Sequence, residues 1–302
     1  MAWNTASPID QLIKLLPISI ARELEAPGMR AGVEEIRVRA GRAVCLCGNG
    51  WEKRGAALCD AALCRALLEA LCEHSAYAME EELREGYFTV AGGCRVGVCG
   101  SLLTRDGTVK RMGEPAGFNI RIAREAPGCA NALMPYLTNG AGPQGALVLS
   151  APGVGKTTLL RDAARQLSDG CARRPGLKVA IADERGELAG MYQGMPCMDV
   201  GERTDVMDGC PKAYAIARLV RSMSPQVIVT DEIGGEDEAA ALLDGANSGV
   251  AILASAHARS VEEALRRPAI RGLIERGCFH RAAILGKDAC GNRLLHIEKL
   301  GA

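Results

Sequence analysis

The chain has 302 residues, enough for two ordinary domains, and its 48% hydrophobic and 24% charged residues are typical of a globular protein rather than a disordered or fibrous one. Its 36 basic and 36 acidic residues cancel, so the chain as a whole does not attract nucleic acid or an anionic membrane. A local basic patch is compatible with these totals.

Neither a membrane span nor a secretion signal is predicted. The sequence has no apolar run of about 18 residues, and residues 1–20 lack the basic start, apolar stretch and cleavage site of a signal peptide. We therefore expect the protein to stay in the cytoplasm.

The 13 cysteines are expected to be reduced and mostly buried, because their number is odd and nothing indicates export. No pair has the spacing of a usual structural metal site. Cys45 and Cys47 are too close in sequence for a typical half-site, and the wider-spaced pairs lack a second pair of ligands.

Residues 1–125 mix helical and strand patterns and predict a smaller N-terminal α+β domain. Alternating apolar residues over 33–38 and 44–47, on either side of Gly41, predict a hairpin.

A helix and further strands follow the hairpin. Apolar residues at helical spacing predict a helix from residue 60 to about Gly86. Strand character returns over 87–103, with Gly92 and Gly93 as a turn.

Beyond residue 125, strands alternate with amphipathic helices, as in an α/β domain with a mostly parallel sheet. Pro127, Gly128 and the stretch 138–145 look like breaks around one helix. The boundary is therefore expected near residues 125–130, with the second domain over 126–302.

A phosphate-binding loop is predicted at the start of this domain. The stretch "SAPGVGKTT" follows the apolar strand 146–149 and precedes a helix that stops at Gly170, and it matches G-x-x-x-x-G-K-[ST] except at the first glycine. The expected nucleotide-binding residues are Ser150, Ala151, Pro152, Gly153, Val154, Gly155, Lys156, Thr157 and Thr158.

Each part of the loop has an expected role. Gly153 and Gly155 let the backbone approach the phosphates, Lys156 reaches the β- and γ-phosphates, and the Thr157 hydroxyl ligates Mg²⁺. Ser150 replaces a glycine where the chain leaves the strand, which is away from the chemistry, so we expect the loop to bind ATP.

Acidic residues follow two later strands. After the strand 227–229, Asp231 is expected to bind Mg²⁺ through water and Glu232 to polarise the attacking water. The strand 178–182 ends in "DERGE", where Glu184 is a further catalytic candidate and an ordinary charged loop is the alternative. His257 follows a fourth strand, where it would sense the γ-phosphate or be merely structural.

Residues 217–260 resemble the core of the type II/IV secretion ATPases, in which an arginine-containing helix, a Walker B strand, an acidic helix and a histidine box follow in that order. The resemblance implies a RecA-like P-loop NTPase domain. The positions that match the functional ones of that pattern are Arg221, Asp231, Glu232, Glu238 and His257.

Within that superfamily, "GGCRVGVCG", "FNIRIARE", "IADERGELAG" and "VGERTDVMDGCPKA" resemble the stage III sporulation AA family of endospore formers. The resemblance implies a hexameric mother-cell ATPase whose N-terminal domain serves oligomerisation or regulation. It would power a channel between mother cell and forespore. Its partners would be the membrane proteins of the same sporulation operon, through which it would contact the membrane.

The sequence departs from the superfamily pattern in ways that leave roles open. The box glutamate is absent from its place before Asp183, so the catalytic base remains open between Glu232, Glu184 and Glu187. The histidine box is "SAHA", which leaves the role of His257 open. The arginines expected to act across subunits are Arg95, Arg121 and Arg124, with ordinary ion pairing as the alternative.

Three hypotheses of function remain. The first is an ATP-hydrolysing motor, in which water attacks the γ-phosphate while Lys156 and Mg²⁺ neutralise charge. The second is a nucleotide-dependent assembly switch with slow turnover. The third is a RecA-like nucleic-acid translocase, against which the zero net charge and the lack of a basic, aromatic-rich tract both count.

Overall fold

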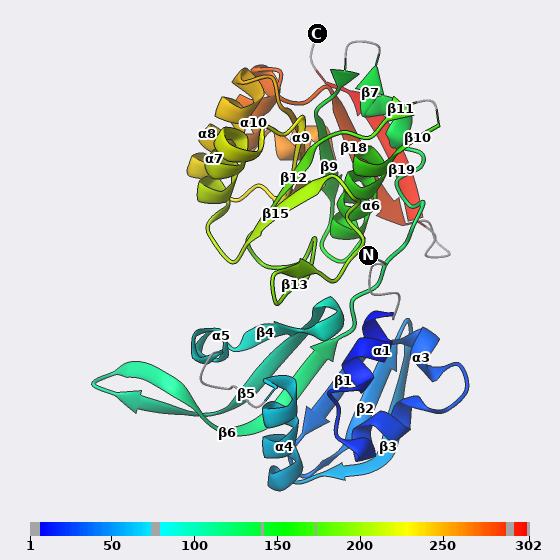
Figure 1. The fold of residues 1–302 in the computed structure, drawn as a ribbon, viewed down its shortest axis with the longest axis vertical. Coiled ribbons are helices and arrows are strands. Elements are labelled where there is room, and N and C mark those ends of the chain that lie inside the picture. The colour runs from blue at the N-terminus through cyan, green and yellow to red at the C-terminus, as the bar shows by residue number, and fades with distance from the viewer. Residues whose placement is uncertain (1–6, 74–78, 140–141, 173, 288–292, 301–302) are drawn as a thin grey trace. The chain divides into compact units, whose positions relative to one another are not determined.

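The computed structural model describes residues 7–73, 79–139, 142–172, 174–287 and 293–300. The chain forms two compact units (Figure 1). Unit 1 contains Met1–Arg124 and Gly190–Cys197, and unit 2 contains Glu125–Ala189 and Met198–Ala302. A single division near residue 125 therefore does not describe the chain, because a short later segment returns to unit 1.

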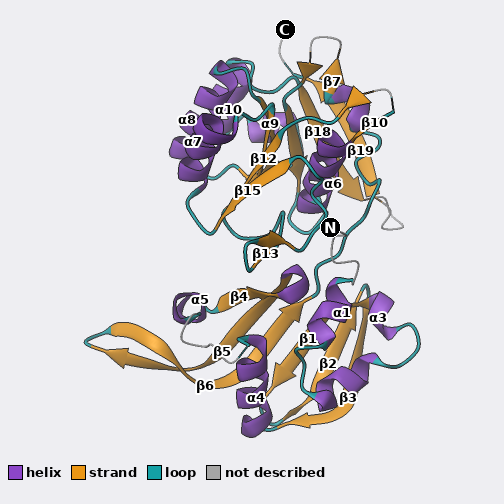
Figure 2. Ribbon diagram, in the orientation of Figure 1, coloured by secondary structure: helices purple, strands orange, loops and turns teal. Residues whose placement is uncertain are grey.

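Unit 1 is built on a six-stranded sheet whose neighbouring strands are all antiparallel, in the order β3-β2-β1-β6-β5-β4 (Figure 2). Its strands are β1 (Val33–Arg39), β2 (Arg42–Gly48), β3 (Trp51–Cys59), β4 (Tyr87–Val90), β5 (Cys94–Arg105) and β6 (Thr108–Arg121). Its helices are α1 (Pro8–Ile13), α2 (Ile18–Ala21), α3 (Met29–Gly32), α4 (Ala61–Leu71) and α5 (Glu80–Glu85), with the short 3-10 turns Arg22–Leu24 and Ala91–Gly93.

One face of this sheet forms the core of unit 1. Ile36, Val96 and Ile120 are fully buried there against Leu12 of α1 and Leu67 of α4. Alternate residues of each strand point to opposite faces, so the intervening residues of β1, β2 and β6 lie on the other face of the sheet.

The predicted hairpin and the turn at Gly92 and Gly93 are confirmed, since Gly41, Gly92 and Gly93 all adopt positive φ values. The single helix predicted up to Gly86 is wrong. Helix α4 ends at Leu71, and Glu73 has a φ of +47°, which a right-handed helix cannot include. Residues 74–78 lie outside the described part of the chain.

The returning segment of unit 1 is a two-stranded hairpin of β13 (Met191–Tyr192) and β14 (Met195–Pro196). Gln193 Nε2 donates to Glu73 Oε2 over 3.1 Å. Burial and a hydrogen bond to Glu73 raise the pKa of the Tyr192 hydroxyl to about 12. Burial raises the pKa of the Cys197 thiol, and the neighbouring backbone of residues 92 and 93 opposes that effect. These contacts attach the hairpin to unit 1.

Unit 2 is built on a seven-stranded sheet in the order β15-β12-β16-β17-β9-β18-β19, parallel except for β19. Its strands are β9 (Ala146–Ser150), β12 (Val179–Asp183), β15 (Thr204–Asp208), β16 (Val227–Glu232), β17 (Ala251–His257), β18 (Arg281–Lys287) and β19 (Arg293–Lys299). Its helices are α6 (Lys156–Asp169), α7 (Lys212–Met223), α8 (Glu236–Asn247), α9 (Val261–Ala264) and α10 (Pro268–Glu275).

Helices cover both faces of the unit 2 sheet. Leu147 and Leu149 of β9 pack in one cluster with residues of α7, α8 and α10, while α6 packs on the other face. Every residue of β9 and β12 is buried, as expected for central strands of a parallel sheet. The α/β fold with a mostly parallel sheet and a smaller N-terminal α+β unit is therefore confirmed.

The helix predicted between residues 128 and 138 is wrong. This segment consists of turns and the short 3-10 helix Met134–Tyr136, because Gly128 has a φ of +86° and Pro135 cannot donate a helical hydrogen bond. Three small strand pairs complete the fold: β7 (Thr138–Asn139) with β8 (Gly142–Pro143), β10 (Gly170–Cys171) with β11 (Arg174–Pro175), and β13 with β14.

All cysteines in the described residues are free. Six of these cysteines are buried and two are exposed. Among the described helices, none has both the length and the apolar character needed to cross a membrane.

Gly145, immediately before β9, is required by packing. A Cβ atom there would lie 2.0 Å from the Cys278 carbonyl oxygen and 3.2 Å from that of Ile252. We expect Gly145→Ala to lower the free energy of unfolding by about 1–3 kcal/mol, because backbone atoms must shift to make room. Urea unfolding followed by circular dichroism measures this.

Gly272→Ala is the matched control. Gly272 lies inside α10, and a Cβ atom added there would have nothing within 4 Å, so alanine should raise the stability by roughly 0.5–1 kcal/mol. Equal unfolding midpoints for the two variants would contradict the packing argument.

Candidate functional site

The loop Ala151–Gly155 joins β9 to α6 and has the geometry of an anion cradle. Gly153 and Gly155 adopt φ values of +74° and +109°, which only glycine adopts readily. Gly155 is the N-cap of α6 and has no side chain to cap it, so the first-turn N–H groups are left for a ligand. The loop and the positive end of α6 therefore fit a polyphosphate.

Ser150, at the position of the missing glycine, is the last residue of β9 and is fully buried. Its Oγ donates to the Ala151 carbonyl oxygen over 2.7 Å. The side chain is thus accommodated within the strand end and does not enter the loop.

Lys156 is connected to Glu232 through His257. The Lys156 ammonium lies 2.7 Å from His257 Nδ1 and 3.5 Å from the Ser150 carbonyl oxygen. His257 Nε2 lies 3.0 Å from Glu232 Oε2. With the ammonium donating to Nδ1, the ring proton sits on Nε2 and is donated to the carboxylate.

Strand register explains why these three side chains meet. Strand β17 lies between β9 and β16 and is parallel to both, so the carboxyl ends of the three strands share one edge of the sheet. His257 is opposite Ser150 in this register. Burial lowers the pKa of Lys156, and the Glu232 carboxylate opposes that effect.

Arg267, just before α10, is a second partner of Glu232 that no sequence motif reveals. Its Nη1 lies 3.8 Å from Glu232 Oε1, and its Nη2 donates to the Ile233 carbonyl oxygen over 2.7 Å. Glu232 thus has a histidine on one carboxylate oxygen and a guanidinium on the other.

Lys212, the first residue of α7, is the centre of a buried ionic cluster. Its Nζ lies 3.1 Å from Asp231 Oδ1, 3.3 Å from Glu238 Oε2 and 3.9 Å from Glu184 Oε2. It also donates to the Glu232 backbone oxygen. Only 7% of the Lys212 side chain is exposed, so these carboxylates provide the charge compensation that water provides elsewhere.

The charges in this cluster depend on one another. Burial opposes the charge on Lys212, but the carboxylates of Asp231 and Glu238 outweigh it and raise the pKa of the ammonium. Burial raises the pKa of Asp231, and Lys212 counteracts this. Sequence reasoning missed Lys212, although it lies in the quoted motif "VGERTDVMDGCPKA".

Asp183 organises a turn. It is fully buried, and its two carboxylate oxygens accept from the backbone N–H groups of Glu187, Leu188 and Ala189 over 2.9, 3.0 and 2.8 Å. Arg161 of α6 donates to the Glu187 and Leu188 carbonyl oxygens over 2.6 Å each. The "DERGE" segment is therefore held rigidly beside the sheet edge.

The other candidate residues lie elsewhere in their units. Arg221 is exposed near the end of α7. Arg95 stacks over the Tyr87 ring at 4.1 Å, and Arg124 donates to the Val33 carbonyl oxygen over 2.7 Å. Arg121 lies opposite Glu35 in the β1–β6 register. Within unit 1, ordinary contacts thus account for these three arginines.

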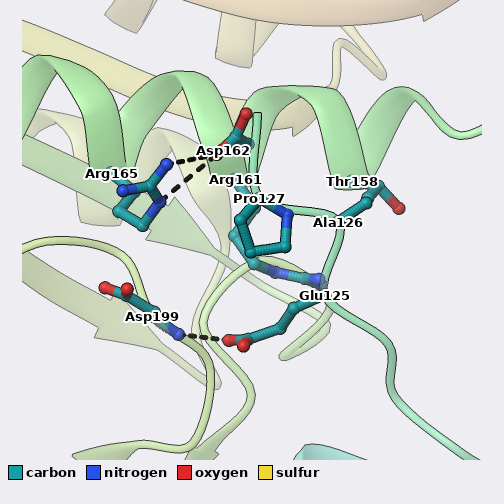
Figure 3. Close-up of a pocket in the computed structure, with 8 residues that line it drawn as sticks. All are labelled: Glu125, Ala126, Pro127, Thr158, Arg161, Asp162, Arg165 and Asp199. Atoms are coloured by element: carbon teal, nitrogen blue, oxygen red, sulfur yellow. Dashed lines mark hydrogen bonds and ion pairs between the residues drawn. The ribbon is translucent and has the colours of Figure 1, made fainter. Parts of the chain in front are cut away.

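Thr158 lines a small pocket on the outer side of α6 (Figure 3). Arg165 Nη2 lies 2.7 Å from Asp162 Oδ1, and the Asp199 backbone N–H donates to Glu125 Oε1 over 2.6 Å. Asp162 also accepts from the Ala130 N–H over 2.8 Å. The Ala130–Asp162 bond attaches the segment after residue 125 to α6, and the Asp199–Glu125 bond attaches it to the stretch before β15.

Comparisons with known proteins agree with this architecture. A family model described as "Sporulation stage III, protein AA" matches residues 8–299. The stage III sporulation protein AA of Bacillus subtilis is 39% identical over 275 residues, which are 90% of this chain and 89% of that protein.

Two solved structures share the fold. The ATPase DotB of Legionella pneumophila gives a TM-score of 0.58 at 15% identity. The match covers 88% of this chain and 76% of the DotB chain. The pilus retraction motor PilT, solved with bound ADP, gives a TM-score of 0.59 at 14% identity. The match covers 93% of this chain and 83% of the PilT chain.

Lys212→Met keeps an unbranched side chain but leaves the buried Asp231 and the partly buried Glu238 without their shared cation. We expect the free energy of unfolding to fall by about 3–5 kcal/mol in a urea titration. The carboxylates raise the pKa of Lys212 above its usual 10.5, so the wild-type contribution is fully present below pH 10.5 and is lost only as the pH rises beyond it.

Lys178→Met, at an exposed lysine of the same unit, is the matched control and should unfold like wild type. Adding Glu238→Gln to Lys212→Met removes one uncompensated charge and should restore part of the lost stability. If Lys212→Met and Lys178→Met had the same urea unfolding midpoint, the stabilising role of the ionic cluster would be refuted.

Proposed function

Because the chain belongs to the stage III sporulation protein AA family, we propose that it is a Mg²⁺-dependent ATPase that acts as the motor of a secretion-like channel between mother cell and forespore. The observation that carries the proposal is the row formed by Lys156, His257 and Glu232 beside an uncapped helix N-terminus. This row joins a phosphate-binding lysine to a carboxylate that can activate water.

The loop residues would bind ATP. Backbone N–H groups from Gly153 to Thr157 and the Lys156 ammonium would hold the phosphates. Thr157 and Asp231 would hold Mg²⁺, which supplies charge neutralisation on the phosphates when bound. Asp231 forms an ion pair with Lys212, so its carboxylate would contact both Lys212 and the Mg²⁺ ion.

Glu232 is the catalytic base that we propose among the three open candidates. Glu184 faces Lys212, and the backbone at Glu187 is held by Asp183 and Arg161. Glu232 instead has its two carboxylate oxygens at His257 and Arg267. His257 would then sense the γ-phosphate, because a phosphate bound to the Lys156 ammonium would compete with His257 Nδ1 for that cation.

The proposal for assembly and location is supported by the family to which the chain belongs. We propose a homo-hexamer in the mother-cell cytoplasm that meets the membrane through the membrane proteins of its sporulation operon. Arg95, Arg121 and Arg124 would act across subunits in this assembly. Their contacts within unit 1 would then be the arrangement of a subunit whose arginines do not reach a neighbouring nucleotide. The assembly switch with slow turnover remains the second candidate. Lys156 and Glu232 are joined through His257, and ATP would have to compete with these contacts before hydrolysis, which would slow turnover.

Lys156→Ala should weaken ATP binding by at least ~100-fold, or about 2.7 kcal/mol, because a charge-assisted contact with the phosphates is lost. Ser150→Gly should change the affinity little, because the serine hydroxyl bonds only to the neighbouring carbonyl. Calorimetric titration with a non-hydrolysable ATP analogue measures both. Equally large losses in the two variants would show that Ser150 belongs to the phosphate-contacting machinery.

Glu232→Gln should lower kcat for ATP by roughly 10²–10⁴-fold while nucleotide still binds, because the amide keeps the size of the side chain but not its basicity. Glu184→Gln and Glu187→Gln serve as matched controls and should keep most of the wild-type rate. Steady-state phosphate release measures all three.

The same assay separates the hypotheses. A wild-type hexamer without turnover would exclude the motor and favour the switch. Stimulation of hydrolysis by single-stranded DNA would favour the translocase. If Glu184→Gln lowered the rate and Glu232→Gln did not, Glu184 beside Lys212 would be the catalytic base.

A further inference from the structure

The open face of the unit 1 sheet carries two cysteines and a carboxylate in adjacent rows. In the register of β1, β2 and β3, Cys47 lies between Glu35 and Glu52, and Cys45 lies between Arg37 and Arg54. Directly opposed residues of antiparallel strands point to the same face. Leu46, between the two cysteines, belongs to the helix-covered core, so both thiols lie on the face opposite to it.

The three ligand atoms are close enough to share one ion. Cys45 Sγ and Cys47 Sγ are 3.8 Å apart, and a Glu52 carboxylate oxygen lies within 4.8 Å of both sulfurs. Tetrahedral zinc with Zn–S bonds of about 2.3 Å places two sulfurs about 3.8 Å apart. The cysteine pair therefore already has the separation of a zinc edge, and a small movement of the exposed Glu52 side chain completes three ligands.

We propose that Cys45, Cys47 and Glu52 form a binding site for a divalent cation of the zinc class, with water as the fourth ligand. Two thiolates with one carboxylate favour borderline-soft Zn²⁺ over hard Mg²⁺ or Ca²⁺, which take oxygen ligands. This site is independent of ATP and lies outside the nucleotide-binding unit.

The sequence spacing of Cys45 and Cys47 is too short for a typical half-site on a loop. It is not too short on a β-strand. On a strand, residues i and i+2 project from the same face, so a Cys-x-Cys pair presents both sulfurs together. The third ligand comes from the neighbouring strand through hydrogen-bond register, which sequence spacing does not show.

Two arginines lie beside Cys45 in the register, Arg37 on β1 and Arg54 on β3. Glu35 already holds Arg37 in a two-bond contact of 3.0 and 3.2 Å, so Arg37 does not compete for Glu52. Arg54 is exposed, so solvent screens its charge. Cys45 is only 5% exposed while Glu52 is open to solvent, so the site combines a shielded sulfur with an entry path.

A redox role fits the same residues less well. Residues i and i+2 of a strand have Cα atoms about 6.6 Å apart, near the upper limit for a disulfide. Cys45 is also only 5% exposed, which limits the access of an oxidant or a second thiol to its sulfur.

A bound ion would connect the edge of the sheet to its interior. Strand β3 is an edge strand, and its pairing with β2 is interrupted between Ala43 and Cys45. An ion held by β2 and β3 would fix the register immediately beyond this interruption.

Titration of the full-length protein with Co²⁺ tests the proposal. We expect one equivalent to give thiolate-to-cobalt charge-transfer absorption that added Zn²⁺ abolishes. Cys47→Ser should lose this absorption, and Glu52→Gln should weaken Co²⁺ binding by at least the roughly 10–100-fold typical of lost metal-site partners. Cys47 is partly exposed and Glu52 is exposed, so both variants should fold, as circular dichroism would verify.

Cys171→Ser is the matched control, because Cys171 is an exposed cysteine of the other unit, and it should bind Co²⁺ like wild type. The proposal is overturned if the wild type shows no thiolate absorption with one equivalent of Co²⁺. It is equally overturned if Cys47→Ser binds like wild type, or if Cys171→Ser loses the absorption to the same extent.

Discussion

The parallel pairing of β9, β17 and β16 is the constraint on which the candidate site depends. Parallel register brings the carboxyl ends of three strands to one edge, so Lys156, His257 and Glu232 meet although they come from distant parts of the chain. A shift of β17 by one residue would turn His257 to the other face of the sheet. Burial of all of β9 and of residues 252–256 of β17 makes that shift costly, so the apolar core determines the geometry of the polar site.

Two buried ionic groups stabilise the surroundings of this row. Lys212 gathers carboxylates from β16, α8 and the segment after β12, and Asp183 gathers three backbone N–H groups of one turn. Such groups tolerate few alternative arrangements, because each unpaired charge or N–H would be buried without a partner. The Asp183 turn ends at Ala189, where the chain enters the hairpin of unit 1. Covalent continuity thus leads directly from the site to the other unit.

Periodicity was sufficient for much of the fold. The buried strands of unit 2, the loop before α6 and the stop at Gly170 were all predicted, because each depends on local apolar pattern or glycine conformation. Predictions failed where local pattern was overridden. The helix expected to continue to Gly86 ends early at a left-handed Glu73, and turns replace the helix expected after Gly128.

The sequence by itself determined that a glycine-rich loop with the phosphate-loop pattern lies between a strand and a helix, and that carboxylates follow strands of the same sheet, because these features depend on residues close together in the chain. Only the tertiary structure decided how these groups pair. It joined Lys156 to His257, assigned Lys212 to Asp231, and placed Glu52 beside two cysteines. Such pairs depend on strand order and register, which are set by packing between segments far apart in the chain.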